Sequence, residues 1–334
     1  MDRDIVVVGA SAGGVEALIR LVEGLSPEIR SAIFVVLHIP ADSTSMLPQI
    51  LSRAGPLPAV TATDRAPIEY GTIYVAPPDH HLLIEDGHMR LTFGPRENGH
   101  RPAVDPLFRT AAVAYGPRVV GVILSGTLGD GTDGMEFVKE HGGVTVVQKP
   151  ADALFPGMPE MVLERVDVDY SLPATRIGEL LMELDGGPEG EKRPPPSRAE
   201  NEPSNDIALQ DIGEGKGPPS TFTCPECHGT LFEVTNGEFT HYTCRVGHAY
   251  SAAGLELAKD RELEDALWSA LRALEERRDL SRRLRERASR GGRKGAEAAF
   301  ARQERDAIER AAIIRRAVLA PRQSEDTAPS ESAE

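Results

Sequence analysis

Short runs of branched apolar residues alternate with stretches of helical periodicity over the first 183 residues. The runs Ile5–Val8, Ala32–Leu37, Val119–Leu124 and Val144–Val147 contain almost no polar side chain. Continuous Val- and Ile-rich runs are typical of parallel strands that are buried on both faces. The pattern therefore predicts an α/β fold, a doubly wound and mainly parallel sheet with helices on both sides.

An antiparallel hairpin is expected within this α/β region. The apolar runs His81–Ile84 and Met89–Phe93 flank Asp86-Gly87, which is a hairpin turn signal. Thr72–Val75, just before them, reads as one more strand of the sheet. We therefore predict a parallel sheet with a hairpin inserted between its strands.

The composition changes after residue 183, and we divide the chain there. Residues 1–183 form the α/β domain, and residues 184–220, rich in Gly and Pro among polar residues, read as a disordered linker. Residues 221–252 form a small cysteine module. Residues 253–320 carry leucines at helical spacing and a Gly291-Gly292 break, which predicts a helical hairpin or coiled coil. Residues 321–334 read as a disordered tail.

Charge and hydropathy narrow the classes of partner and compartment. The 334 residues have a formal net charge of -15 and a pI of about 5.1, which argues against a nucleic-acid partner. The sequence has no apolar run of about 18 residues, so we expect no membrane insertion. The charged start, Met1–Asp4, and the short apolar run after it do not fit a secretory signal. We therefore expect a cytoplasmic protein.

A glycine-rich turn directly after the first apolar run is the first candidate for chemistry. Gly9–Gly14 leads from a strand into a helix pattern and satisfies G-x-S-x-G, the turn that presents a nucleophilic serine, here Ser11. The amino terminus of the following helix can stabilise developing negative charge. The same turn could instead cradle a phosphate. It lacks the glycine spacing of a dinucleotide site and the Lys of a Walker loop.

A nucleophilic serine needs a base and an acid that orients the base. His38 ends the second buried strand, and Asp130 lies in the loop after the strand at 119–124. The carboxyl ends of parallel strands share one edge of a sheet, so Ser11, His38 and Asp130 can converge there. Asp133 competes for the role of the acid. The chain order Ser, His, Asp differs from that of α/β-hydrolases, so the turn is no evidence for that fold.

The cysteine module has the ligand spacing of a metal site. All three cysteines of the chain fall in the pattern C-x2-C-x16-C-x3-H, which suits tetrahedral zinc. The expected ligands are Cys224, Cys227, Cys244 and His248, with His228 and His241 as rivals for the fourth position. Strand-like residues around Asn236-Gly237 predict a zinc ribbon. Four protein ligands would make the site structural and closed, so we expect a chelator to unfold this module and to leave any hydrolysis largely intact.

Six segments, in order, resemble those of the CheB protein-glutamate methylesterases of chemotaxis. They are Val8–Gly14, Val35–Pro40, Tyr74–His81, Arg101–Phe108, Ser125–Met135 and Phe155–Pro159. The resemblance covers about residues 4–183 and implies that Ser11 is the nucleophile, His38 the base and Asp130 the acid. Asp133 falls at a variable position of the family's motif.

The resemblance also implies an activity and a partner. Such an enzyme hydrolyses γ-glutamyl methyl esters on the cytoplasmic helices of chemoreceptors, and many members also deamidate receptor glutamines. Catalysis would need no cofactor, and other chemosensory signalling proteins are further expected partners. A rival interpretation is a non-catalytic CheB-like signalling scaffold.

Two features depart from the family's pattern. Thr127 stands where the family often has Met near the oxyanion site, so rate or specificity is expected to differ. The α/β domain begins at residue 4, which leaves no room before it for the receiver domain of the best-known members. We therefore expect no control by phosphorylation in cis.

Overall fold

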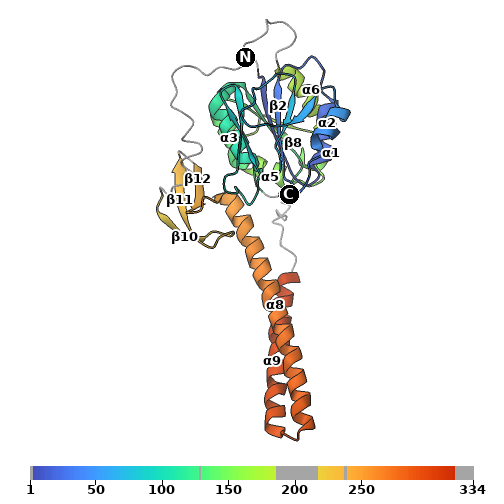
Figure 1. The fold of residues 1–334 in the computed structure, drawn as a ribbon, viewed down its shortest axis with the longest axis vertical. Helices are drawn as coiled ribbons and strands as arrows, with labels where there is room; N and C mark the ends of the chain where they lie inside the picture. The colour runs from blue at the N-terminus through green and yellow to red at the C-terminus, as the bar shows by residue number, and fades with distance from the viewer. Residues whose placement is uncertain (1–2, 128, 186–216, 237–238, 320–334) are drawn as a thin grey trace, which may run out of the picture. The chain divides into compact units, whose positions relative to one another are not determined.

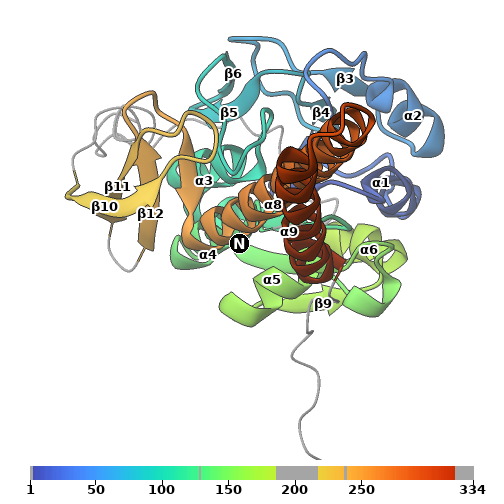
Figure 2. The ribbon, with the colours of Figure 1, turned by 90° about the horizontal axis from the view of Figure 1, so that it is seen from below.

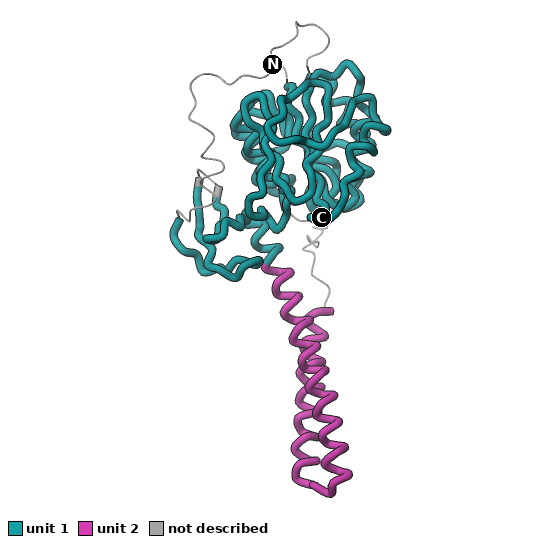
Figure 3. Tube along the Cα trace, in the orientation of Figure 1, with its two compact units in different colours: residues 1–258 teal, residues 259–334 magenta. Residues whose placement is uncertain are grey.

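The computed structural model describes residues 3–127, 129–185, 217–236 and 239–319. The chain forms two compact units, residues 1–258 and residues 259–334 (Figure 3). The expected linker falls largely outside the described residues, and the expected tail falls wholly outside them. Among the described helices, none is long and apolar enough to cross a membrane.

A seven-stranded sheet forms the centre of the first unit, and all its strands are parallel (Figure 1). Its order is β3-β4-β2-β1-β7-β8-β9. The strands are β1 (Ile5–Ala10), β2 (Ala32–Leu37), β3 (Ala59–Thr61), β4 (Ile73–Val75), β7 (Val119–Ile123), β8 (Val144–Gln148) and β9 (Tyr170–Leu172). The predicted parallel sheet is confirmed. The two edge strands, β3 and β9, are only three residues long and partly polar, and hydropathy did not indicate them.

Helices cover both faces of this sheet, which explains why its central strands are apolar throughout. Val6, Val8 and Ala10 of β1 pack with α1 (Gly14–Glu23), α2 (Leu47–Ala54) and α6 (Ala174–Leu184). Ile5 and Val7 pack on the opposite face with α3 (Val104–Tyr115), α4 (Thr132–Glu140) and α5 (Gly157–Arg165). Figures 1 and 2 show α1, α2 and α6 across the sheet from α3. Alternate side chains of one strand thus enter two cores.

The predicted hairpin is also confirmed as β5 (His81–Glu85) and β6 (His88–Thr92), a separate antiparallel pair. Leu82, Ile84 and Met89 join the core on the α3 side. The hairpin therefore shields one side of α3.

The strand order places the carboxyl ends of β2, β1 and β7 next to one another. β1 pairs with β2 on one side and with β7 on the other. The chain runs from β1 to β2, then to the edge strand β3 and back to β4, before it crosses to β7 on the opposite side of β1. Such a reversal of strand order leaves a crevice at the carboxyl ends of the strands, where ligands bind in open α/β sheets.

The cysteine module is a four-stranded antiparallel sheet within the first unit. Its strands are β10 (Pro219–Thr223), β11 (Thr230–Asn236), β12 (Phe239–Cys244) and β13 (Ala249–Ser251). A small core of Leu231, Tyr250 and Leu255 packs with two of the cysteines. So few apolar side chains bury little surface, and modules of this size usually need a metal or disulfides for stability.

Two helices follow, α8 (Ala252–Arg290) and α9 (Lys294–Leu319), as the spacing of leucines predicted. The helices break at Gly291-Gly292, and Gly292 has a φ of 66°, which favours glycine. Within the second unit Leu271, Ala288, Ala307 and Ala311 are buried, whereas Trp268 is exposed. An Arg285–Glu304 ion pair of 2.9 Å joins the two helices.

Candidate active site and metal centre

Ser11 follows β1 and is fixed by its own backbone. Its N–H donates to the Ser125 carbonyl oxygen at 3.0 Å, and its carbonyl accepts from the N–H of Gly14 at 2.9 Å. Gly13 has a φ of 70°, and a Cβ there would lie 2.7 Å from Ser125 Oγ, so the turn requires glycine. Ser11 is therefore held between the end of β7 and the start of α1, and the residue is partly exposed.

His38 follows β2 and meets Asp130 from the loop after β7. His38 Nε2 lies 2.7 Å from Asp130 Oδ2, and the two side chains are 5% and 0% exposed. A carboxylate at this distance holds the imidazole proton on Nε2. His38 Nδ1 is buried and has no hydrogen-bond partner among the described residues. This nitrogen is therefore the one that can take up a proton.

Asp130 is held as a carboxylate by several donors. Oδ2 accepts from the Val104 N–H at 2.6 Å, and Oδ1 accepts from Asn98 Nδ2 at 3.0 Å and the Asp105 N–H at 3.3 Å. Burial alone would raise the pKa of Asp130. The hydrogen bond and charge of His38, the charge of His100 and the Val104 N–H overcome burial and lower this pKa.

His100 lies against the face of His38. The two imidazole centroids are 3.7 Å apart and their planes differ by 7°. The stack and the bond to Asp130 together fix the plane in which His38 can move a proton. His100 lies in an irregular turn before α3, a segment for which periodicity predicts no role.

A second buried carboxyl group, that of Asp105, adjoins Asp130. Asp105 is 2% exposed, and its Oδ1 accepts from the N–H groups of Gly131 at 3.0 Å and Gly134 at 2.7 Å. Burial, followed by the charges of Asp130 and Asp133, raises the pKa of Asp105 well above its usual value. The two neighbouring carboxyl groups thus have opposite shifts, which leaves Asp130 as the ionised member.

The rival acid, Asp133, lies in the first turn of α4. Burial raises its pKa to about 6, against the opposing charge of Arg109. The carboxylate that contacts His38 is that of Asp130. Spacing along the sequence did not separate these two acids, because they lie only three residues apart in the segment after β7; the resemblance to the family's motif favoured Asp130.

Residues 155–158 form backbone hydrogen bonds with the loop beside Ser11. The Gly126 N–H donates to the Phe155 carbonyl, and the Met158 N–H donates to the Gly126 carbonyl, both at 2.9 Å. A Cβ on Gly126 would lie 3.0 Å from Ser11 Cβ and 2.1 Å from Met158 Sδ. The loop therefore runs directly alongside Ser11, with Thr127 exposed next to it.

The four expected metal ligands form one cluster. The ligand atoms of Cys224, Cys227, Cys244 and His248 all lie within 4.8 Å of one another. The Sγ atoms of Cys227 and Cys244 are 3.6 Å apart, and His248 Nδ1 lies 3.6 and 3.5 Å from the Sγ atoms of Cys224 and Cys244. Four ligands around zinc with Zn–S near 2.3 Å lie about 3.8 Å apart. The cluster therefore fits tetrahedral zinc.

The surroundings of His248 support the same fit. Its Nδ1 faces the thiols, and its Nε2 lies 3.3 Å from Glu226 Oε2. A carboxylate on the second nitrogen orients a ligating histidine. The two rivals lie outside the four-residue cluster: His228 is exposed with a φ of 57°, and His241 belongs to β12.

Two known proteins that share one name are similar in sequence to the α/β region of this chain. A protein of Hydrogenovibrio crunogenus named protein-glutamate methylesterase/protein-glutamine glutaminase is 37% identical over 184 residues, which are 54% of this chain and 49% of that protein. A protein of Methanosarcina mazei with the same name and the number 2 is 33% identical over 190 residues, 54% of this chain and 52% of that protein. The chain thus spans about half the length of these two relatives.

A solved structure gives the same result. The crystal structure of the Thermotoga maritima CheB methylesterase catalytic domain matches with a TM-score of 0.53 and 34% identity, covering 55% of this chain and 100% of that one. Residues 6–181, more than half of the chain, match the family model described as CheB methylesterase. With the fold and these residues in agreement, the chain belongs to the CheB methylesterase family, a family of hydrolases.

Proposed function

We propose that this protein hydrolyses glutamyl methyl esters on the cytoplasmic helices of chemoreceptors, with Ser11, His38 and Asp130 as its catalytic triad. The observation that carries the proposal is the 2.7 Å contact between His38 and Asp130 at the carboxyl ends of strands that flank the Ser11 strand. The names of the relatives support the substrate class, and they add glutamine deamidation as a second reaction.

The geometry suggests how each residue acts. Ser11 Oγ attacks the ester carbonyl while His38 Nδ1 takes its proton, and Asp130 stabilises the imidazolium that forms. Collapse of the tetrahedral intermediate returns that proton to the leaving oxygen and releases methanol. Water then attacks the glutamyl ester of Ser11, with His38 as base, and frees the glutamate carboxylate. With a glutamine side chain the same steps release ammonia.

The oxyanion of the intermediate would form next to the first turn of α1 and the loop at residues 125–127. Backbone N–H groups at a helix amino terminus stabilise such a charge. The exposed Thr127 in this loop is where we expect the departure from the family's pattern to affect rate or specificity.

The cysteine cluster has a structural part in this proposal. Cys224, Cys227, Cys244 and His248 would hold a zinc ion that stabilises the ribbon and supplies no group to the reaction. We place the reaction in the cytoplasm, where methylated receptor helices are exposed.

Release of methanol from a methylated receptor fragment tests the proposal. The wild-type protein should release methanol in proportion to the glutamates formed, and Ser11→Ala should not, at equal folded concentration. The rival function, a non-catalytic scaffold, predicts binding of the fragment without methanol from either protein. That outcome would overturn the enzymatic proposal.

A further inference from the structure

The ribbon contacts the turn that precedes α3. The Asn98 N–H donates to the Ala249 carbonyl at 2.9 Å, and the Ala249 N–H donates to the Arg96 carbonyl at 3.2 Å. Glu97 and Ala249 form an isolated parallel bridge. Strand β13 therefore extends its pairing onto this turn, one residue after the expected metal ligand His248.

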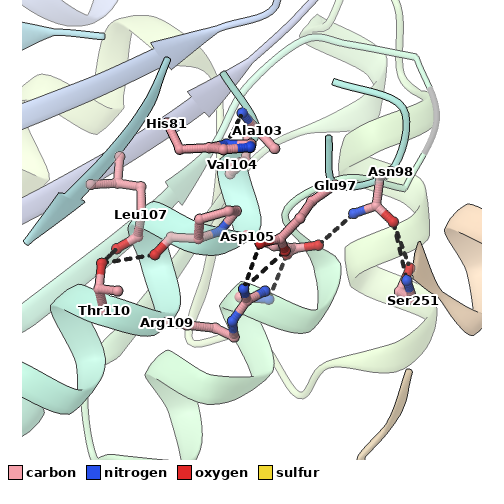
Figure 4. Close-up of polar contacts among 12 residues, drawn as sticks. His81, Glu97, Asn98, Ala103, Val104, Asp105, Leu107, Arg109, Thr110 and Ser251 are labelled. Atoms are coloured by element: carbon pink, nitrogen blue, oxygen red, sulfur yellow. Dashed lines mark hydrogen bonds and ion pairs between the residues drawn. The ribbon is translucent and has the colours of Figure 1, made fainter. Parts of the chain in front are cut away.

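The side chain of Asn98 lies between Ser251 of the ribbon and Asp105, the carboxyl group that adjoins Asp130 (Figure 4). Its Nδ2 donates to Asp105 Oδ2 at 2.7 Å and to Asp130 Oδ1 at 3.0 Å. Its Oδ1 accepts from the Ser251 N–H at 3.1 Å and from Ser251 Oγ at 3.4 Å. One carboxamide thus has its donor end on two carboxyl groups and its acceptor end on the ribbon.

Ser251 determines which way this carboxamide points. A rotated amide would direct its oxygen at the Asp130 carboxylate and its NH2 group at the Ser251 N–H, so both of these contacts would become repulsive. The backbone of Asn98, at a φ of 50°, is held by Ala249. The ribbon therefore fixes both the position and the orientation of the donor that reaches Asp130.

The start of α8 packs tightly on the same point. A Cβ on Gly254 would lie 2.1 Å from Asn98 Oδ1. Beside Asp130, a Cβ on Gly129 would lie 3.5 Å from Ala253 Cβ and 3.9 Å from Leu257 Cδ1. Residues 249–257 thus adjoin both Asn98 and the loop that carries Asp130.

We propose that Asn98 is a positioning residue for Asp130, and that residues 249–254, from β13 of the ribbon into the start of α8, hold it in place. The proposal rests on the triad proposed above. Asn98 supplies one of the donors that keep the Asp130 carboxylate turned toward His38. The ribbon, which is not part of the α/β domain, thereby influences the efficiency of the triad.

Two variants separate this role from general stability. Asn98→Gly removes the carboxamide without straining the positive φ. Gly254→Ala leaves Asn98 in the sequence but forces its carboxamide to move, and Ala favours helix over Gly. Gly295→Ala in α9 is the matched control, since nothing lies within 4 Å of the added Cβ.

The probe is a fluorophosphonate, which reports on the triad without a receptor. Ser11 Oγ displaces fluoride from phosphorus, and mass spectrometry locates and times the adduct. Loss of one hydrogen bond to a charged group predicts a phosphonylation rate constant about 10- to 100-fold lower for Asn98→Gly. The phosphonylation rate constant of Gly254→Ala should be lowered severalfold. The reversible affinity for the probe should be unchanged in both variants. In the double variant, Gly254→Ala should add nothing to Asn98→Gly.

Each outcome bears on a different statement. If wild-type Ser11 takes no label, the triad itself is wrong. If wild type is labelled and Asn98→Gly or Gly254→Ala reacts like Gly295→Ala, the positioning role is overturned. Additive losses in the double variant would also overturn it, because the two substitutions would then act through separate contacts.

Discussion

Replacing Asp130 by Asn should slow ester hydrolysis by about 10³–10⁴-fold, and the contacts of Asp130 show why. Its Oδ2 accepts from His38 Nε2 and the Val104 N–H, and its Oδ1 accepts from Asn98 Nδ2 and the Asp105 N–H. An Asn side chain must place its NH2 group at one of these two positions, and each choice sets a donor against donors.

The two orientations fail for different reasons. With NH2 at the Oδ2 position, His38 must accept at Nε2 and carry its proton on Nδ1, so Nδ1 can no longer act as the base. With NH2 at the Oδ1 position, two buried donors lose their acceptor, and each loss of a hydrogen bond to a charged group costs about 1.5–3 kcal/mol. A loss of 10³–10⁴ in rate is about 4–5.5 kcal/mol of transition-state stabilisation.

The assay is methanol release at saturating receptor fragment, with folding checked by circular dichroism. Asp133→Asn is the matched control, because the same substitution three residues away leaves the contacts of His38 in place. We expect this control to stay within about twofold of wild type. An Asp130→Asn variant within tenfold of wild type would refute the reasoning, since His38 would then need no carboxylate.

Three further predictions concern stability, pH and the metal. Gly9→Ala should lower the free energy of unfolding by about 1–3 kcal/mol in urea titrations, because its Cβ would lie 2.4 Å from Val104 Cγ1; an unchanged midpoint would contradict this packing. Burial raises the folded-state pKa of Asp133 to about 6 from 3.8, so the free energy of unfolding of the wild type should fall as pH rises between these values. At pH 7.5, Asp133→Asn should therefore raise the free energy of unfolding by about 1–2 kcal/mol, once partial exposure is allowed for. Equal stabilities of the two proteins at pH 7.5 would count against the shift. Purified wild-type protein should contain about one zinc per chain, and the Cys244→Ser variant should contain none. Removal of the zinc by a chelator should slow phosphonylation of Ser11 as much as Gly254→Ala does. Wild-type protein without zinc would contradict the assignment of a zinc ribbon.

The last of these predictions differs from what the sequence suggested. From the sequence alone we expected chelation to leave hydrolysis largely intact, since the expected triad of Ser11, His38 and Asp130 uses no metal. The hydrogen bonds of Asn98 with Ala249 and Ser251 join residues about 150 positions apart, and no local pattern indicates them. Because of these contacts, we now expect chelation to cause a partial loss of the reactivity of Ser11.

Much of the fold was predictable because its signals are local. The buried strands of the parallel sheet are apolar on both faces, and Asp86-Gly87 marks the turn of the β5–β6 hairpin. The short edge strands and the turn at residues 97–100 gave no such signal. Asn98, His100 and Asp105 act through contacts made in three dimensions, so their roles became visible only when the ends of β1, β2 and β7 came together.

The strand order also has a consequence for how activity is gained during folding. His38 and Asp130 are 92 residues apart in the chain, and β1 pairs with β7 across more than one hundred. Contacts of such high contact order form only after long stretches of chain have been ordered, which makes parallel sheets slow to assemble. Refolding followed by fluorophosphonate labelling should therefore show reactivity returning in the slowest phase, after most helical signal has recovered, because a partly folded chain has its serine but lacks the neighbouring strands that supply its base and acid.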